Sequence, residues 1–377
     1  MALNQMRFAT TMNYWMLIVA AGLFSAGHAF ATTHCVATAD ELTAALLAAE
    51  QNTTESDEIR LRTGNFAAPD GGWHVDVQQR GIVIEGGFTD DACNAQSLDA
   101  SLTVLDGGGA VRPLTIDTSF GGQQVATGIV VRGITVENGV GASVGGLKIS
   151  DSGPIYNAEI LVERNIFRNN VSSQYQEDNS AGALLAATDG PIPDEAFLLV
   201  RDNLFVGNRG RDGAAAMLFS NNAINVVNNT VTGNQSDDTD LATRKTIATF
   251  TFSQITYSNN IFWGNNPDAL DDTYDFRGDN PFREDLPADL FNNDMQAVLG
   301  TPGTQSDNQS VNPHFVDAAA GNFRLDATSP LIDAGTATPL GDLGPADLDG
   351  FARAQGAEVD IGAYEHEVDG IFFNGFD

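Results

Sequence analysis

A phrase of eleven residues recurs four times along the middle of the chain, and it restricts the fold more than any other feature. The copies begin at Ile160, Leu198, Ile224 and Ile255, and a looser copy begins at Ile129. Successive copies start 31, 38, 26 and 31 residues apart, so the unit accepts insertions while its core stays constant. Such a repeat is typical of a solenoid, in which each turn buries its apolar side against its neighbours.

Within each copy, apolar residues occupy the first and third positions, and more polar residues occupy the second, fourth and fifth. Alternation with a period of two indicates a strand with one buried face. An Asn follows at the sixth position, and a second short apolar run comes after it. We expect this Asn to form the bend in the left-handed region and to bond to the Asn of the next coil. The resulting Asn ladder would consist of Asn165, Asn203, Asn229 and Asn260.

These features predict an all-β chain folded as a right-handed parallel β-helix. An antiparallel sandwich would explain the alternation, but it does not require the same Asn and Phe at matching points of successive units. Ahead of the repeats, an amphipathic helix is predicted at about 40–52, because Leu42, Ala45, Leu46 and Ala49 share one face. This helix would cap the N-terminal end of the solenoid and cover its exposed strand edge.

The domain boundaries follow from composition and turn signals. Residues 1–31 combine Arg7, an apolar stretch and a small-x-small site, as in a cleaved secretory signal peptide. The sequence therefore predicts a protein that is secreted or on the outer cell surface, with no transmembrane segment in the mature chain. The other predicted units are an N-terminal cap with a first strand (32–80), the β-helix (81–310) with a long loop region at about 266–310, C-terminal coils and their cap (311–366), and a tail (367–377).

Charge and cysteine content limit the partners and the compartment. The formal net charge is −32 and the only lysines are Lys148 and Lys245, which argues against a nucleic-acid partner. Cys35 and Cys93 are the only cysteines, so an oxidising compartment predicts one disulfide between them, with two unpaired thiols as the alternative. We expect a monomer that needs no cofactor, with calcium as the one candidate ion.

The early strands carry a family resemblance. Residues 35–42, the Ile-Val-Ile-Glu-Gly-Gly-Phe strand at 82–88, Cys93, and Leu-Asp-Gly-Gly at 105–108 appear in that order. This series resembles the N-terminal portion of exported bacterial proteins of the pectate-lyase-like β-helix superfamily. The resemblance implies that the strand at 82–88 belongs to an early coil.

A second resemblance covers about 311–366. Its motifs, in order, are Asn-Pro-His-Phe-Val-Asp (312–317), Asn-Phe-Arg-Leu (322–325), Ser-Pro-Leu-Ile-Asp-Ala-Gly (329–335), Asp-Leu-Asp-Gly (347–350) with Arg353, and Asp-Ile-Gly-Ala-Tyr-Glu (360–365). The series is similar to the choice-of-anchor Q domain, a C-terminal module of bacterial surface β-helix proteins. That resemblance implies export and attachment or release at the cell surface, and it implies no catalytic chemistry.

Three aspartates of this segment, Asp347, Asp349 and Asp360, allow two interpretations. With Arg353 they would form a buried ion-pair cluster over the end of the core, which is the interpretation we prefer. Asp-x-Asp-Gly also resembles the start of a calcium-binding loop, although the remaining ligands of such a loop are missing.

The sequence contains no catalytic constellation of the kind used by β-helix hydrolases. The histidines after residue 31 lack the expected neighbours, and the paired aspartates fall in apparent turns. Arg132, Arg164 and Arg201 occupy neighbouring repeat positions and would either form a carbohydrate-binding strip or, as we prefer, pair with Glu163 and Asp202.

We therefore expect a non-enzymatic protein whose repeat surface serves adhesion or glycan binding, with a polysaccharide or a host or cell-surface component as its partner. Two alternatives remain open. One is a polysaccharide lyase or glycoside hydrolase of the pectate-lyase-like superfamily. The other is a purely structural surface component.

Overall fold

The computed structural model describes residues 30–367, except 53, 78–79, 119–126, 152–157, 174–179, 189–197, 238–244, 252, 267–275, 278–286, 297, 300 and 354. The predicted signal peptide therefore lies outside the described residues, apart from its last two positions. All but the first residue of the predicted tail also lies outside them. Within the described part of the chain, no helix is long and apolar enough to cross a membrane.

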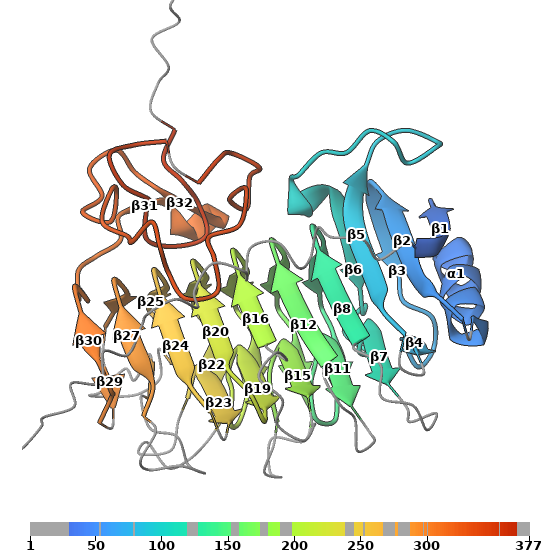
Figure 1. Ribbon diagram of the computed structural model, residues 1–377, viewed down its shortest axis with the longest axis horizontal. Coiled ribbons are helices and arrows are strands. Elements are labelled where there is room, and N and C mark those ends of the chain that lie inside the picture. Colours follow the sequence, from blue (N-terminus) through green and yellow to red (C-terminus); the bar gives the residue numbers. More distant parts are fainter. Residues whose placement is uncertain are drawn as a thin grey trace, which may run out of the picture.

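The chain winds as a right-handed parallel β-helix with three long parallel sheets (Figure 1), which confirms the predicted fold. The ten-stranded sheet contains β1 (Phe30–Val36), β2 (Ser56–Arg62), β5 (Ile82–Phe88), β8 (Thr127–Arg132), β12 (Ala158–Glu163), β16 (Leu198–Arg201), β20 (Ile224–Val227), β24 (Ile255–Ser258), β27 (Asp289–Phe291) and β30 (Gln305–Ser306). The eight-stranded sheet contains β3 (Gly64–Ala67), β6 (Thr103–Asp106), β9 (Thr135–Glu137), β13 (Ile166–Arg168), β17 (Leu204–Val206), β21 (Thr230–Thr232), β25 (Ile261–Trp263) and β28 (Asp294–Met295).

The third long sheet has six strands, and shorter elements complete the fold. The six strands are β4 (Trp73–Asp76), β7 (Leu114–Thr118), β11 (Leu147–Asp151), β15 (Leu184–Thr188), β19 (Ala216–Ser220) and β23 (Ile247–Thr251). A four-stranded sheet contains β10 (Val140–Gly141), β14 (Val171–Ser172), β18 (Arg209–Gly210) and β22 (Gln235–Ser236), and a parallel pair contains β26 (Phe276–Arg277) and β29 (Val298–Leu299).

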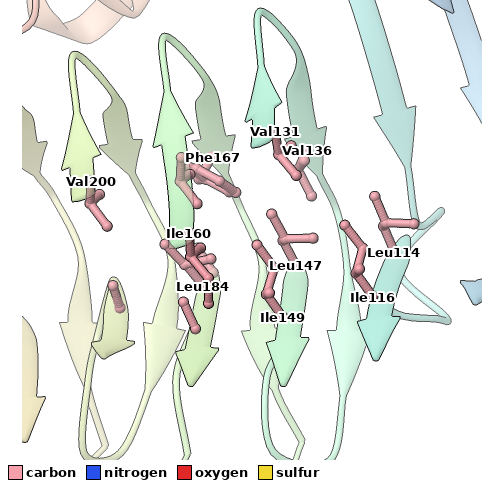
Figure 2. Close-up of a cluster of buried hydrophobic side chains, with 14 of the residues drawn as sticks. Leu114, Ile116, Val131, Val136, Leu147, Ile149, Ile160, Phe167, Leu184 and Val200 are labelled. Atoms are coloured by element: carbon pink, nitrogen blue, oxygen red, sulfur yellow. The ribbon is translucent and has the colours of Figure 1, made fainter. Parts of the chain in front are cut away.

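The repeat sets the register between coils. Ile160 pairs with Leu198, Leu198 with Ile224, and Ile224 with Ile255, so the first positions of the four copies stack. Inside the coils, apolar side chains of all three sheets meet (Figure 2). Phe167 and Phe205 stack there with ring centroids 4.9 Å apart. Burying each such side chain contributes about 1.5–3 kcal/mol, so neighbouring coils stabilise one another.

The predicted helix forms as α1 (Ala39–Gln51) and covers the N-terminal end of the core. Thr38 caps it, because its side chain accepts from the main-chain N–H of Glu41, whose carboxylate accepts from the N–H of Thr38. The solenoid begins earlier than the predicted residue 81, since β2, β3 and β4 already pair within the three long sheets. This coil was missed because it carries no copy of the repeated phrase.

The bend between the two strands of each phrase differs from the prediction. Arg164, Asp202, Asn228 and Asn259 have φ values between 51° and 58°, whereas the ladder Asn that follows each of them does not have a positive φ. The left-handed residue is therefore the fifth of the phrase. Because it turns the chain, its side chain lies outside the coil, and the next residue points into the core.

The C-terminal segment also differs from the prediction. Residues 311–366, here called the C-terminal module, do not continue the stack of coils or cover the end of the core. They contain an antiparallel pair, β31 (Phe315–Asp317) and β32 (Asn322–Leu325), followed by irregular chain. The module lies on the flank of the solenoid beside β16, β20, β24 and β25 (Figure 1). Its apolar residues pack against Ile166, Leu204 and Ile261 of the eight-stranded sheet, and this contact buries them as a further coil would have done.

Candidate functional site

Cys35 and Cys93 form a disulfide, with their Cα atoms 5.6 Å apart. The bond joins β1 to the loop that follows β5, so it fastens the first strand to the body of the solenoid. It leaves no cysteine of the chain free for catalysis or metal binding.

The four ladder residues lie one above another inside the solenoid. Asn165 Nδ2 donates to Asn203 Oδ1 at 3.1 Å, and the links from Asn203 to Asn229 and from Asn229 to Asn260 are 3.0 Å each. Beyond the predicted set, the ladder continues through Asn293 and Asn308. A second ladder of Asn170, Asn208, Asn234 and Asn265 was not predicted, although the repeated Phe-x-x-Asn endings carry its signal. All of these amides are hydrogen-bonded within the solenoid and stabilise the stacking of its coils.

The outer side of the ten-stranded sheet carries charges of alternating sign. Glu85, Arg132, Glu163 and Arg201 occupy one register position on successive coils. Arg132 Nε lies 2.9 Å from Glu85, and Arg201 Nη2 lies 2.7 Å from Glu163. Burial would raise the pKa of Glu163, but the facing arginines hold it below its usual value. Arg132 and Arg201 are thus occupied by ion pairs and do not form a free basic strip.

Arg353 of the C-terminal module extends this charge network. Its guanidinium donates to Asp202 on the solenoid and, at 3.0 Å, to Glu365 within the module. The segment before Glu365 docks through its main chain, because the N–H of Gly362 donates to the carbonyl of Asn259 at 2.8 Å. Gly362 has a φ of 109°, and a Cβ there would lie 2.6 Å from a side-chain carbon of Ile261. The Asp-Ile-Gly-Ala-Tyr-Glu motif is therefore a docking element.

The three candidate metal ligands have protein partners. Asp347 accepts main-chain N–H groups of Asp349, Phe351 and Glu365. The side chain of Asp349 pairs with Arg324, and Asp360 accepts from the N–H groups of Asp333 and His366. The direct ion-pair partners of Arg353 are Asp202 and Glu365, neither of which belonged to the preferred cluster, while the buried Asp347 lies close enough for its charge to act on Arg353. Among the described residues, no group of three or more His, Cys, Asp or Glu side chains is placed to hold a metal.

The outer side of the six-stranded sheet presents a different surface. One register position on its strands forms a continuous line, here called the outer row. Its members are Asp76, Asp117, Ser150, Ala187, Phe219 and Phe250. Neighbouring strands lie roughly 4.8 Å apart, so the row extends for about 24 Å. Each of its side chains is partly exposed.

Asp117 organises the polar end of the outer row. Its carboxylate accepts from Ser150, lies 3.0 Å from Nε2 of His74 and 3.6 Å from Nζ of Lys148. Burial would raise the pKa of Asp117, but the hydrogen bonds from Ser150 and His74 and the charge of Lys148 lower it. Asp117 is therefore a carboxylate at neutral pH. It can accept hydrogen bonds, but it is a poor general acid.

The other end of the outer row is aromatic. The rings of Phe219 and Phe250 stack with centroids 4.6 Å apart and planes 11° apart, and Lys245 lies over Phe250 at 5.4 Å. Beside them, Met217 and Ala248 are buried although they point outward. The two rings are thus supported from one side and partly exposed. This surface was not predicted, because the strands of this sheet lie between the copies of the repeated phrase.

The three stacked parallel sheets define the chain as a right-handed parallel β-helix protein. No family model matches the chain, and no curated protein matches it. A search of solved structures finds the crystal structure of pectate lyase Pel9A at 13% identity, with a TM-score of 0.44, over 86% of this chain and 90% of that chain.

Proposed function

We propose that this chain is an exported β-helix protein that binds an extended, uncharged polysaccharide along the outer row without cleaving it. The observation that carries the proposal is the stacked pair Phe219 and Phe250, in line with the polar group around Asp117. The exposed part of this aromatic pair would pack against the apolar faces of sugar rings, while sugar hydroxyl groups would bond to polar side chains such as Ser150. The strongly negative chain would repel polyuronates.

The absence of catalysis is part of the proposal. The carboxylates best placed on the outer surfaces are already paired, Glu163 with Arg201 and Asp117 with Ser150 and His74. A glycosidase needs two carboxyl groups facing one bond, with one of them held protonated. Asp117 has a lowered pKa and does not meet that need. A lyase or hydrolase remains the alternative function, and a structural surface component the second one.

We also propose a cell-surface setting, from the resemblance of about 311–366 to choice-of-anchor Q domains. In that proposal, the C-terminal module would mediate attachment or release, while the solenoid presents the outer row. The disulfide between Cys35 and Cys93 is in keeping with an oxidising compartment outside the cytoplasm.

A binding screen against neutral and acidic polysaccharides tests the proposal. For a bound neutral glycan, replacing both Phe219 and Phe250 by Ala should weaken affinity by about tenfold or more, since each ring contact contributes on the order of 1 kcal/mol. Phe351→Ala is the matched control, because Phe351 is an exposed phenylalanine of the C-terminal module. Equal affinity in the double variant would rule out the outer row. Release of reducing ends or unsaturated uronates from any polysaccharide would instead favour the enzymatic alternative.

A further inference from the structure

Residues 336–345 of the C-terminal module cross the outer side of β16, β20 and β24, and we call this segment the strap. A Cβ placed on Gly341 would lie 2.8 Å from the Cβ of Asn225, and one on Gly344 would lie 3.0 Å from Cζ of Arg201. Both glycines have positive φ values, 99° and 76°. The strap therefore lies directly against the sheet at these points.

Several buried polar side-chain atoms beside and beneath the strap have no hydrogen-bond partner among the described residues. Asn228 is fully buried, and within the described part of the chain neither polar atom of its side chain has a hydrogen-bond partner. The same holds for Oγ1 of Thr256 and Oγ of Ser258. The fourth member is Asp202, whose Oδ1 accepts from Arg353, while its Oδ2 lies 3.8 Å from Nε of Arg201 and has no hydrogen-bond partner among the described residues. We call these four side chains the polar stripe.

The polar stripe is one surface because its members adjoin in register. Ser258 pairs with Val227, and the N–H of Asn228 donates to the carbonyl of Ser258. The N–H of Asp202 donates to the carbonyl of Val227, which places Asp202 on the other side of Asn228. Each buried polar group without a partner costs about 1–3 kcal/mol, and native proteins seldom leave several together.

The strap itself is weakly held. Its polar contacts with the solenoid are at Thr336, which exchanges two hydrogen bonds with Asn259, and at Asp342, which lies 3.6 Å from Arg201. Between them Leu340 is 38% exposed. A segment with few buried apolar contacts opens at low cost, and here opening would also return the polar stripe to polar surroundings.

We propose that the strap is a displaceable lid and that the polar stripe is a second binding site, which takes a hydroxyl-rich ligand such as a neutral sugar. The amide of Asn228 and the hydroxyls of Thr256 and Ser258 both donate and accept, as sugar hydroxyls do, and Asp202 Oδ2 adds an acceptor. The site lies on a different sheet from the outer row and does not depend on the function proposed for that row.

Thiol labelling measures the opening of the strap. Both native cysteines are in the disulfide, so a Ser258→Cys variant carries one free thiol beneath the strap. Val226→Cys places a thiol on the core side of β20 and reports only unfolding of the coil. We expect Ser258→Cys to label at least tenfold faster than Val226→Cys. Equal rates would show that the strap does not open separately.

A strap variant provides an independent measurement. Adding Gly341→Ala to Ser258→Cys should accelerate labelling, because the new methyl group would meet Asn225. Gly321→Ala is the matched control, since Gly321 also has a positive φ but no atom within 4 Å of the added Cβ. If Gly341→Ala and Gly321→Ala accelerated thiol labelling equally, the proposal that the strap is a lid would be wrong.

Ligand binding is tested with a mixture of cello-, xylo- and maltohexaose as the probe. An excess of these neutral oligosaccharides should slow the labelling of Ser258→Cys several-fold, and adding Asn228→Ala should abolish that protection. If Ser258→Cys labelled rapidly and the oligosaccharides did not slow it, the proposal that the polar stripe binds sugars would be wrong. A failure to bind glycans at the outer row would not change the outcome of this labelling experiment. The proposals for the outer row and for the polar stripe can therefore be rejected independently.

Discussion

Arg353 of the C-terminal module donates to the carboxylate of Asp202 on the solenoid, although the two residues are 151 positions apart in the chain. The same guanidinium binds Glu365, so one buried cation holds a carboxylate of each part. All three side chains are at least 95% buried. Because a buried charge without a partner is costly, this contact couples the position of the module to the integrity of the coils.

Replacing Arg353 by Met should destabilise the docked module by about 3–5 kcal/mol, because Asp202 and Glu365 would be left buried without their cation. Urea unfolding, together with limited proteolysis of the module, measures the change. Arg324→Met is the control. Arg324 is half-exposed where it pairs with Asp349, so its loss should cost about 1 kcal/mol or less. Equal effects of the two variants would show that Arg353 has no special role.

Stability should rise as the pH falls from 7.5 to 5. Burial raises the pKa of Asp202 to about 6, and it raises the pKa values of Asp294 and Glu365 to about 7. Each of these groups keeps its proton in the folded state at a pH where the unfolded chain has lost it. Their contribution is therefore present at acidic pH and is lost as the pH rises from about 4 to about 7. The midpoint of thermal unfolding should be higher at pH 5 than at pH 7.5.

The variant Asp294→Asn separates this effect from the general loss of negative charge. Asp294 Oδ1 accepts from the N–H of Val311, which an amide oxygen can replace, while Oδ2 has no hydrogen-bond partner among the described residues. The variant should show a smaller change between pH 7.5 and 5 than the native protein. An unchanged slope would mean that Asp294 does not titrate in this range.

The stacking of the coils was predictable because it is local and repeated. Apolar and polar residues alternate around Ile160, so the strand has one buried face, and Asn165 recurs at the same position of each copy. Equivalent residues of successive coils must then lie against one another to be buried. The assignment of the bend failed by one residue. Arg164 has a long charged side chain, and intrinsic preferences alone do not place such a residue in the left-handed region.

The contacts of the C-terminal module were not predictable in the same way. Arg353 could be recognised as a buried cation, but its partner Asp202 lies on a coil far away in sequence. The outer row was missed for a related reason. Ser150, Phe219 and Phe250 align only when three separate strands are stacked, and those strands do not contain the repeated phrase.

Asn229→Ala should be among the most destabilising single substitutions in the solenoid. The side-chain amide donates to the carbonyls of Val200 and Val227 and to Asn260, and its oxygen accepts from Asn203. Removing it leaves several buried groups unpaired, at about 1–3 kcal/mol each. A loss of roughly 3 kcal/mol or more is expected in urea unfolding.

The control for that measurement is Asn65→Ala on β3. Asn65 is exposed, so its replacement should change the free energy of unfolding by no more than about 0.5 kcal/mol. If both variants lost the same free energy, the ladder would contribute nothing beyond ordinary strand pairing.

Calcium provides the remaining test of the C-terminal module. Asp347 and Asp360 accept main-chain N–H groups, and Asp349 pairs with Arg324, so these carboxylates would have to give up existing partners to bind a cation. We therefore expect thermal unfolding to have the same midpoint in excess calcium and in a chelator. A midpoint that rises with calcium concentration would show linkage between binding and folding and would restore the calcium interpretation. Asp349→Asn would then locate the site, because it would abolish the rise if Asp349 were a ligand.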